Sequence, residues 1–164
     1  MQQVSNIEDI FREYFKNAIV PDRIIELGTA TGVFAHLIYK LRKEINNNFD
    51  FITIDRLSLI DDLPSNMIFC KMNIYKNIKF IANLIKPRTL FLCDGGNKIS
   101  EVRLFTPFLK EDCVIMAHDY AKNKSIGNKY WWCCEIEWSD ISDLEMLFYF
   151  QELMETGGWV SLKK

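Results

Sequence analysis

The sequence lacks a long hydrophobic run, a basic leader and a marked excess of charge of one sign. No apolar stretch approaches the ~20 residues that a membrane-spanning helix needs, and the first five residues, MQQVS, lack the basic start and apolar block of a secretory signal. The formal net charge is only −2, which argues against nucleic acid or an acidic membrane as a partner. We therefore expect a cytoplasmic globular protein without a membrane partner.

Metal-binding and dithiol motifs are also missing. The five cysteines include no C-x-x-C pair, so neither a zinc site nor a thioredoxin-like site is indicated. Cys70, Cys93 and Cys113 lie inside apolar runs, where a small buried thiol is expected. An odd number of cysteines without metal-site spacing fits a reducing compartment, although a redox role for Cys133 and Cys134 stays open.

Apolar, strand-like segments alternate with amphipathic, helix-like segments along the chain. The hydrophobic periodicity predicts strands at 24–27, 51–54, 67–72, 90–93 and 113–117, and helices at 5–20, 34–45, 78–85 and 99–109. The first, fourth and fifth strands are continuous apolar runs, which are typical of strands buried on both faces. Since no linker or repeat is visible, we predict a single domain over residues 1–164. It should be an α/β, Rossmann-like three-layer sandwich, with a mostly parallel central sheet and helices on both faces.

The C-terminal part is harder to assign. Residues 140–155 are predicted to be helical, with a strand at 147–150 as the alternative, and a last short strand is expected at 159–162. Four aromatic residues crowd the segment after the fifth strand, namely Tyr130, Trp131, Trp132 and Trp138. They indicate either a wall or lid over a binding pocket, or core packing, or a subunit interface in a homo-oligomer.

A glycine-containing turn follows the first predicted strand. Residues 23–32 read RIIELGTATG, which is an apolar run with the pattern E-x-G-x-x-x-G before a helix start. A dinucleotide-binding turn prefers G-x-G-x-x-G, but Ala30 occupies the place of its second glycine, which argues against a nicotinamide oxidoreductase. A phosphate-binding P-loop would need Gly-Lys-Ser/Thr, which is absent. The turn therefore favours a nucleoside without phosphates, and Gly28 would let that ligand lie close.

Each of the five predicted parallel strands ends in a polar residue: Glu26, Asp55, Asn73, Asp94 and Asp119. In open α/β sheets, ligands bind outside the carboxyl ends of the strands, near the point where the strand order reverses. Asp55 can accept hydrogen bonds from both hydroxyls of a ribose, and Glu26 adds negative charge that suits a cationic ligand. S-adenosylmethionine meets these demands, since it carries a ribose diol, an ammonium and a sulfonium but no phosphate.

The turn, the acid after the second strand and the strand pattern together resemble class I S-adenosylmethionine-dependent methyltransferases. The sequences CDGGNK at 93–98 and AHDY at 117–120 are similar to the strand ends D-G-G/D-H and H-D-Y of a small-molecule and sugar O-methyltransferase subgroup. The resemblance covers residues 23–120 and implies methyl transfer to an oxygen of a small-molecule or sugar acceptor. The cofactor-binding residues that it implies are Glu26, Gly28, Thr29, Ala30, Gly32, Asp55, Arg56, Asn73 and Asp94.

Some members of this subgroup bind a divalent cation through acids at these two strand ends. The fourth and fifth strands should be neighbours, which would bring Asp94 and Asp119 close enough to share Mg²⁺. Such an ion would hold an acceptor hydroxyl and lower its pKa. Without a metal, the reaction needs proximity, alignment and a base, for which His118 is the candidate. We thus predict His118, Asp94 and Asp119 as catalytic residues and leave two points open: whether a metal is used, and whether Asp94 binds only the cofactor.

Two departures from the subgroup keep a second hypothesis open. Asn97 stands where the subgroup usually has histidine, and the part after residue 120 is short for a class I enzyme. The alternative is a catalytically degenerate protein that binds the cofactor or a partner protein without transferring a methyl group.

Overall fold

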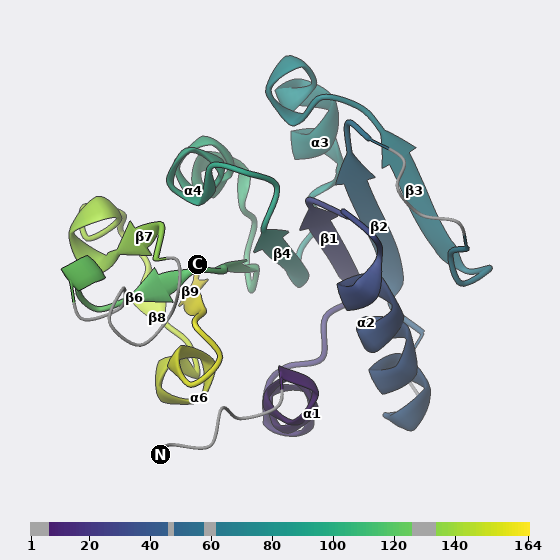
Figure 1. Cartoon of the computed structure of the whole chain (residues 1–164), viewed down its shortest axis with the longest axis horizontal. Coiled ribbons are helices and arrows are strands. Elements are labelled where there is room, and N and C mark those ends of the chain that lie inside the picture. The colour runs from purple at the N-terminus through teal and green to yellow at the C-terminus, as the bar shows by residue number, and fades with distance from the viewer. Residues whose placement is uncertain (1–6, 46–47, 58–61, 126–133) are drawn as a thin grey trace.

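The computed structural model describes residues 7–45, 48–57, 62–125 and 134–164. Its main feature is a seven-stranded sheet with the strand order β3-β2-β1-β4-β5-β9-β8 (Figure 1). The first five strands in chain order are parallel to one another, whereas β9 is antiparallel to both β5 and β8. The strands are β1 (Arg23–Leu27), β2 (Asp50–Asp55), β3 (Met67–Lys71), β4 (Thr89–Cys93), β5 (Val114–Ala117), β8 (Leu147–Phe148) and β9 (Val160–Lys163).

Helices cover both faces of this sheet, so the molecule has three layers (Figure 1). On one face, α1 (Ile7–Asn17), α2 (Val33–Glu44) and α6 (Gln151–Glu155) share one apolar cluster with the sheet. On the other face, α3 (Ile78–Leu84) and α4 (Lys98–Phe105) pack with the sheet in a second cluster. The predicted α/β, Rossmann-like three-layer architecture is therefore confirmed.

The two clusters explain why the central strands are apolar throughout. Side chains alternate between the two faces of a strand, so Ile24 and Leu90 enter the cluster of α1 and α2, while Ile25 and Phe91 enter that of α3 and α4. All four are at most 1% exposed. Alternating polar residues would leave one of these helical layers without an apolar surface to pack on.

The strand order reverses at β1, which pairs with β2 on one side and with β4 on the other. Leu27, the last residue of β1, is in register with Ile54 of β2 and Cys93 of β4. The turns that leave these three strands therefore emerge together at one edge of the sheet. This is the place where ligands of open α/β sheets bind.

The predicted helix over 140–155 is wrong for most of its length. A short 3₁₀ helix, η3 (Trp138–Asp140), and turns lead into β8, and only α6 is helical. Leu147 and Phe148 pair with β9, so these residues find backbone partners across the sheet. Phe150 then takes a left-handed conformation, with φ at 53°, which ends the strand and starts α6. The alternative of a strand near 147–150 was the better one.

Smaller elements refine the other boundaries. The helix predicted over 99–109 ends as α4 at Phe105, and Pro107 lies in the 3₁₀ helix η2 (Thr106–Phe108) that follows. Another 3₁₀ helix, η1 (Ile74–Lys76), follows β3, and a two-stranded sheet joins β6 (Tyr120–Ala121) to β7 (Ile136–Glu137). The start of the helix predicted over 5–20, residues 5 and 6, lies outside the described residues.

Two of the three cysteines that were expected to be buried are buried, and the third, Cys70, is only partly buried. Cys93 and Cys113 are buried free thiols, and Cys70 and Cys134 are partly buried free thiols; Cys133 is not among the residues that the structure describes. In the described parts of the chain, every helix is too short or too polar to be a membrane-span candidate.

Candidate functional site

The turn after β1 is shaped by two glycines in left-handed conformations, with φ at 90° for Gly28 and 80° for Gly32. A Cβ atom added to Gly28 would lie 2.1 Å from the backbone carbonyl oxygen of Asp94 and 2.6 Å from the Cα of Gly95. Gly32 is the N-terminal cap of α2 and donates its N–H to the carbonyl of Thr29. The expected close approach at Gly28 is therefore made to the turn after β4, which the glycine holds directly against the turn after β1.

Asp55, at the end of β2, holds the glycine turn from the other side. Its Oδ2 accepts the backbone N–H of Ala30 at 3.0 Å, and its Oδ1 accepts that of Leu57 at 3.0 Å. Ala30 takes a left-handed conformation (φ 45°) although it is not a glycine. Such backbone strain persists where the surroundings impose it and is frequent at ligand sites. The acid expected to meet a ribose thus also orders the turn beside it.

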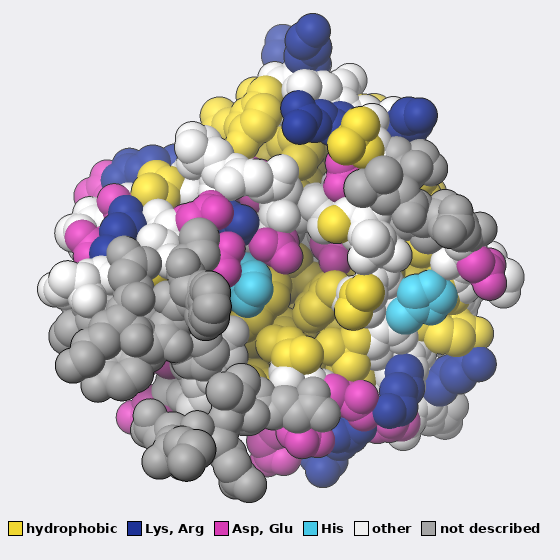
Figure 2. All heavy atoms as spheres, in the orientation of Figure 1, with side chains coloured by type: hydrophobic (Ala, Val, Ile, Leu, Met, Phe, Trp, Pro, Cys, Tyr) yellow, Lys and Arg dark blue, Asp and Glu magenta, His cyan; other side chains and the backbone are white. Residues whose placement is uncertain are grey.

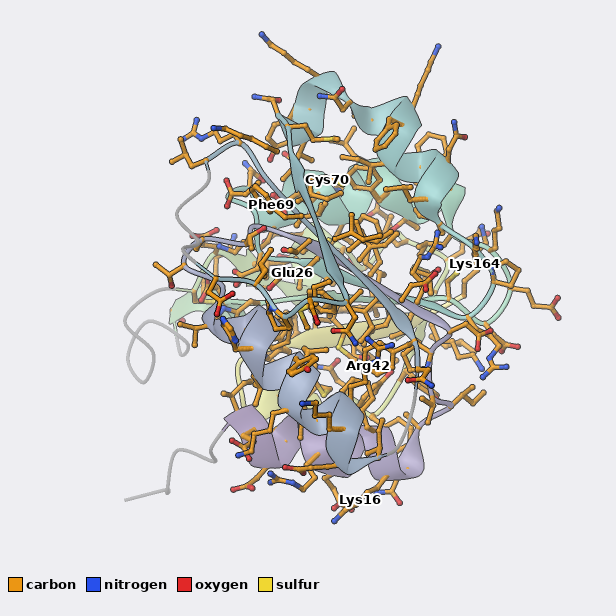
Figure 3. The ribbon with its side chains drawn as sticks, turned by 90° about the vertical axis from the view of Figure 1, so that its right-hand side faces the viewer. Lys16, Glu26, Arg42, Phe69, Cys70 and Lys164 are labelled. Carbon is orange, nitrogen blue, oxygen red and sulfur yellow. The ribbon has the colours of Figure 1, made fainter. Side chains whose placement is uncertain are left out.

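Glu26 lies near the end of β1 and is only 2% exposed. Figure 3 shows it in the interior of the molecule, in contrast to Lys16, which points outward from α1. Thr53 of the neighbouring strand β2 donates its hydroxyl hydrogen to Glu26 Oε2, and the hydroxyl oxygens of Thr53 and Thr29 are 2.6 Å apart. A short chain of hydrogen bonds therefore connects the buried carboxyl group to the glycine turn.

Burial raises the pKa of Glu26 to about 8. The hydrogen bond from Thr53 lowers the pKa, whereas the negative charges of Asp94 and Asp55 add to the rise. A pKa this far from the ordinary value often marks a ligand or catalytic site. In the protein without a ligand, Glu26 is thus mainly a neutral carboxylic acid at pH 7, and a nearby cation would favour its ionised form.

The raised pKa predicts that the free energy of unfolding falls as the pH rises from about 4.5 to about 8. Over this range the unfolded chain has lost the Glu26 proton while the folded chain keeps it, so each step up in pH favours unfolding. Urea unfolding at several pH values measures the slope. Glu26→Gln, which keeps the acceptor oxygen for Thr53 and removes the proton equilibrium, should flatten this part of the profile; an unchanged slope in the variant contradicts the assignment.

A cavity of about 560 Å³ opens beside the glycine turn. Figure 2 shows a hollow with hydrophobic side chains on its floor and acidic side chains and a histidine at its edge. An apolar wall is formed by Ile7 of α1, by Val33, Phe34 and Leu37 of α2, and by Trp159. The other lining residues are Glu26, Gly28, Thr29, Ala30, Thr31, Asp94, His118 and Gly157. Among the described residues that line it, there is no lysine or arginine and there are two carboxyl groups.

The acidic end of the site is formed where β4 and β5 leave the sheet. His118 Nδ1 lies 3.5 Å from Asp94 Oδ1 and 3.5 Å from Asp119 Oδ1, and its ring packs on Trp159 with the ring centroids 4.8 Å apart. Asp119 takes a left-handed conformation with φ at 59°. Burial would lower the pKa of His118, but the hydrogen bond to Asp94 and the charges of Asp94 and Asp119 outweigh it and hold this pKa above its usual value. His118 is therefore oriented by two carboxylates and made more basic by them.

One ligand atom from each of Asp94, His118 and Asp119 lies within 4.8 Å of the others, which is the arrangement of a candidate metal centre. However, an ammonium group already contacts both carboxylates. Lys98 Nζ is 3.1 Å from Asp119 Oδ2 and 3.5 Å from Asp94 Oδ1, and it also lies 3.2 Å from Glu135 Oε2. Burial lowers the pKa of Lys98, but the hydrogen bond and the three negative charges together raise it above its ordinary value. With this ammonium in place, the donor set does not fit a divalent cation.

The structure brings some of the predicted site residues together and not others. The cavity is lined by Glu26, Gly28, Thr29, Ala30, Asp94 and His118. Asp119 does not line the cavity but joins this group through His118 and Lys98. The remaining predicted residues, Gly32, Asp55, Arg56 and Asn73, lie outside the lining.

Two asparagines of the predicted motifs serve as helix caps. Asn73 Oδ1 accepts the N–H of Lys76 at the start of η1, and Asn97 Oδ1 accepts the N–H of Ser100 at the start of α4. Asn side chains satisfy free N–H groups at helix starts in this way. Asn97, which stands where the methyltransferase subgroup usually has histidine, therefore has a structural role as the cap of α4.

Lys98, Glu135 and Trp159 are site residues that the sequence did not reveal. One feature of the sequence could have identified Lys98. The helix dipole disfavours a lysine in the first turn of a helix, so a lysine at this position indicates nearby acidic groups. Glu135 and Trp159 come from the C-terminal part, whose path the periodicity did not predict. Of the predicted aromatic wall, Tyr130, Trp131 and Trp132 lie outside the described residues, and Trp138 packs on Phe148 with ring centroids 4.6 Å apart.

Comparisons with known proteins give similarity at the level of the fold. No protein-family model matches the chain, and no curated protein sequence matches it. Among solved structures, CmcI without a ligand aligns with a TM-score of 0.72 and 12% identity, covering 96% of this chain and 70% of CmcI. CmcI with Mg and SAM gives a TM-score of 0.67 and 15% identity over the same shares of the two chains.

Two further structures carry methyltransferase names. A Staphylococcus aureus protein described as a caffeoyl-CoA O-methyltransferase has a TM-score of 0.62 and 12% identity, covering 96% of this chain and 83% of that protein. MycE methyltransferase from the mycinamycin biosynthetic pathway, with Mg and SAH, has a TM-score of 0.55 and 12% identity, covering 96% of this chain and 48% of MycE. At these identities the likeness shows the fold alone: this chain has the Rossmann-like α/β fold of methyltransferase structures.

Proposed function

We propose that the protein transfers a methyl group from S-adenosylmethionine to an oxygen of a small molecule. The observation that carries the proposal is the cavity at the point where the strand order reverses, which is lined by the carboxyl groups of Glu26 and Asp94 and by no described lysine or arginine. A phosphate-bearing ligand would meet the negative charge of Asp94 there, whereas a ligand with a sulfonium and an ammonium would be attracted to it and would favour the ionised form of Glu26. The presence of SAM or SAH in two structures with the same fold supports the same choice.

In this proposal the cofactor site is formed by two groups of residues. Glu26, Gly28, Thr29, Ala30, Gly32 and Asp94 surround the cationic part of the ligand beside the glycine turn. The second group lies where the ribose and base would extend: Asp55 ends β2, Arg56 follows it, and Asn73 lies just after β3. Asp55 is only partly buried, so its carboxylate can accept ribose hydroxyls while it holds the turn. When bound, S-adenosylmethionine supplies an electrophilic methyl group.

His118 and the two acids beside it provide the acceptor side. Because Nδ1 of His118 faces Asp94 and Asp119, the tautomer with its proton on Nδ1 is favoured, which leaves Nε2 to receive the proton of an acceptor hydroxyl. The acceptor oxygen forms the new bond to the methyl carbon as the carbon–sulfur bond breaks, and the bonding electron pair stays on sulfur. The apolar wall of Phe34, Leu37 and Trp159 favours an acceptor whose hydroxyl is attached to an aromatic or aliphatic body.

The alternative is a degenerate protein that binds the cofactor without transferring a methyl group. Asn97 caps α4, and in the present proposal His118 is the base in place of a histidine at position 97. Methyl release from S-adenosylmethionine in the presence of any acceptor excludes the degenerate alternative. Thermal stabilisation by NAD without stabilisation by S-adenosylmethionine would instead favour a nicotinamide oxidoreductase.

Isothermal titration with S-adenosylmethionine and S-adenosylhomocysteine tests the cofactor. We expect binding by the wild-type protein, and Asp55→Asn should weaken it by about tenfold to a hundredfold, because a hydrogen bond to a charged group contributes roughly 1.5–3 kcal/mol. Asp50→Asn is the matched control, since Asp50 lies at the other end of the same strand and pairs with Arg23 at an exposed position. Its affinity should equal that of the wild type. Absence of binding to the wild-type protein would overturn the proposed function.

A further inference from the structure

Lys98 carries an almost buried ammonium group that contacts three carboxylates. Its side chain is 8% exposed, and its ammonium nitrogen lies within 3.5 Å of three carboxylates, those of Asp94, Asp119 and Glu135. These acids come from the end of β4, the end of β5 and the segment before β7. A single ammonium group therefore joins three segments that are distant in the sequence.

This position is unfavourable for a lysine unless the acids require a cation. Lys98 is the first residue of α4, where the helix dipole disfavours positive charge, and burying an ammonium is costly unless it is paired and hydrogen-bonded. The same argument applies to the acids. Three carboxylates so close together would repel one another without a positive charge among them.

The ammonium also contacts the two carboxylates to which a divalent cation would have to bind. The oxygens that could ligate such an ion belong to Asp94 and Asp119, with Nδ1 of His118 as the third donor. Both carboxylates contact Lys98 Nζ within 3.5 Å. A metal bound to the same carboxylates would lie next to a fixed positive charge, and the repulsion would weaken its binding strongly. The ammonium and the metal are therefore alternatives.

We propose that Lys98 takes the place of the divalent cation, so that the acceptor end of this site works without a metal. Lys98 acts as a positioning residue: it holds the carboxylates of Asp94 and Asp119, and these carboxylates hold the ring of His118. The role of Lys98 in catalysis rests on the proposed methyl transfer. Its effect on metal binding does not depend on that proposal. CmcI with Mg and SAM and MycE with Mg and SAH would then differ from this chain in the source of positive charge.

Mn²⁺ binding, followed by electron paramagnetic resonance of the free ion, tests the proposal without any methyl acceptor. The wild-type protein should bind no Mn²⁺ at this site at concentrations up to about a millimolar. Lys98→Met, which removes the charge and keeps a similar side-chain length, should create a site at least about tenfold tighter, because the three carboxylates lose their cation. Adding Asp119→Asn to Lys98→Met should abolish that site. Lys163→Met is the matched control, since Lys163 pairs with Asp112 far from the cavity lining, and it should gain no site.

Two results would overturn the proposal. The first is that the wild-type protein binds Mn²⁺ at micromolar concentration and that Asp119→Asn abolishes this binding. The second is that Lys98→Met folds but binds no Mn²⁺. Should Lys98→Met fail to fold, the wild-type titration and its Asp119→Asn comparison still decide the question. Titration with S-adenosylhomocysteine in the same preparations separates the two proposals. Cofactor binding together with wild-type Mn²⁺ binding overturns only the role of Lys98, whereas no cofactor binding overturns the proposed function and leaves the metal result standing.

Discussion

Gly28→Ala is expected to lower the free energy of unfolding by about 3 to 5 kcal/mol, through backbone strain and overpacking together. The added methyl group would lie 2.1 Å from the backbone carbonyl oxygen of Asp94 and 2.5 Å from its carbonyl carbon. These are backbone atoms of the turn after β4, so the clash cannot be relieved by a change of rotamer. The left-handed φ of 90° adds a conformational cost. Urea unfolding followed by circular dichroism measures the loss.

Gly158→Ala separates the two contributions. Gly158 has a φ of 76°, and a Cβ added there would meet no atom within 4 Å. The control should therefore lose only the conformational part, about 1 kcal/mol. Equal losses in the two variants would mean that the turns after β1 and β4 are not packed as the structure has them. A larger loss in Gly28→Ala would establish their direct contact, on which the placement of Asp94 beside Glu26 depends.

The central part of the fold could be predicted because its determinants are local. Strands such as β1 and β4 are apolar runs of a few residues, and each is followed by a glycine or an acid that marks a turn. The period of the apolar residues then distinguishes these strands from helices such as α2. The parallel orientation of strands that a helix connects, such as β1 and β2 or β4 and β5, follows from that connection. Sequence reasoning therefore found the sheet and the edge at which its polar residues gather.

The last strand, predicted at 159–162, is confirmed as β9 (Val160–Lys163), but the segment before it could not be assigned because its structure depends on distant residues. Leu147 and Phe148 form a strand only because β9 offers an edge for pairing, and Phe150 ends that strand with a strained φ of 53°. The local sequence left both a helix and a strand open at 147–150, and it gave no sign of the left-handed conformation of Phe150. The same reason hid Glu135 and Trp159, whose roles arise from contacts with Lys98 and His118 on other elements.

Within the candidate site, residue type alone did not separate ligand-binding groups from structural ones. Asn73 and Asn97 stand at strand ends beside the acids, yet their side chains cap the short helices that follow. Lys98 follows Asn97 directly and is the residue that contacts the acids. A polar residue after a strand has two uses, capping and ligand binding, and only the direction of its side chain decides between them. Sequence position therefore predicts where a site lies better than it predicts which side chains enter it.

His118→Gln is expected to reduce kcat for methyl transfer by about 10²- to 10⁴-fold, which is the usual contribution of a general base. Glutamine has a similar reach and can donate to Asp94, but it cannot accept a proton at neutral pH. The affinity for S-adenosylhomocysteine should stay within about twofold of the wild type, since proton transfer takes no part in cofactor binding. His36→Gln is the matched control, because His36 is an exposed residue of α2 whose ring nitrogen lies 3.0 Å from the backbone oxygen of Asp62. It should leave kcat unchanged.

A second substitution distinguishes proton transfer from packing. His118 stacks on Trp159, with 4.8 Å between the ring centroids, so a loss of activity in His118→Gln alone has two explanations. His118→Phe keeps an aromatic ring against Trp159 and removes both nitrogens. If both variants lose kcat to the same extent, the missing group is the proton acceptor. If His118→Phe retains activity and His118→Gln does not, the ring serves to shape the cavity, and the base must be sought in Asp94 or Asp119.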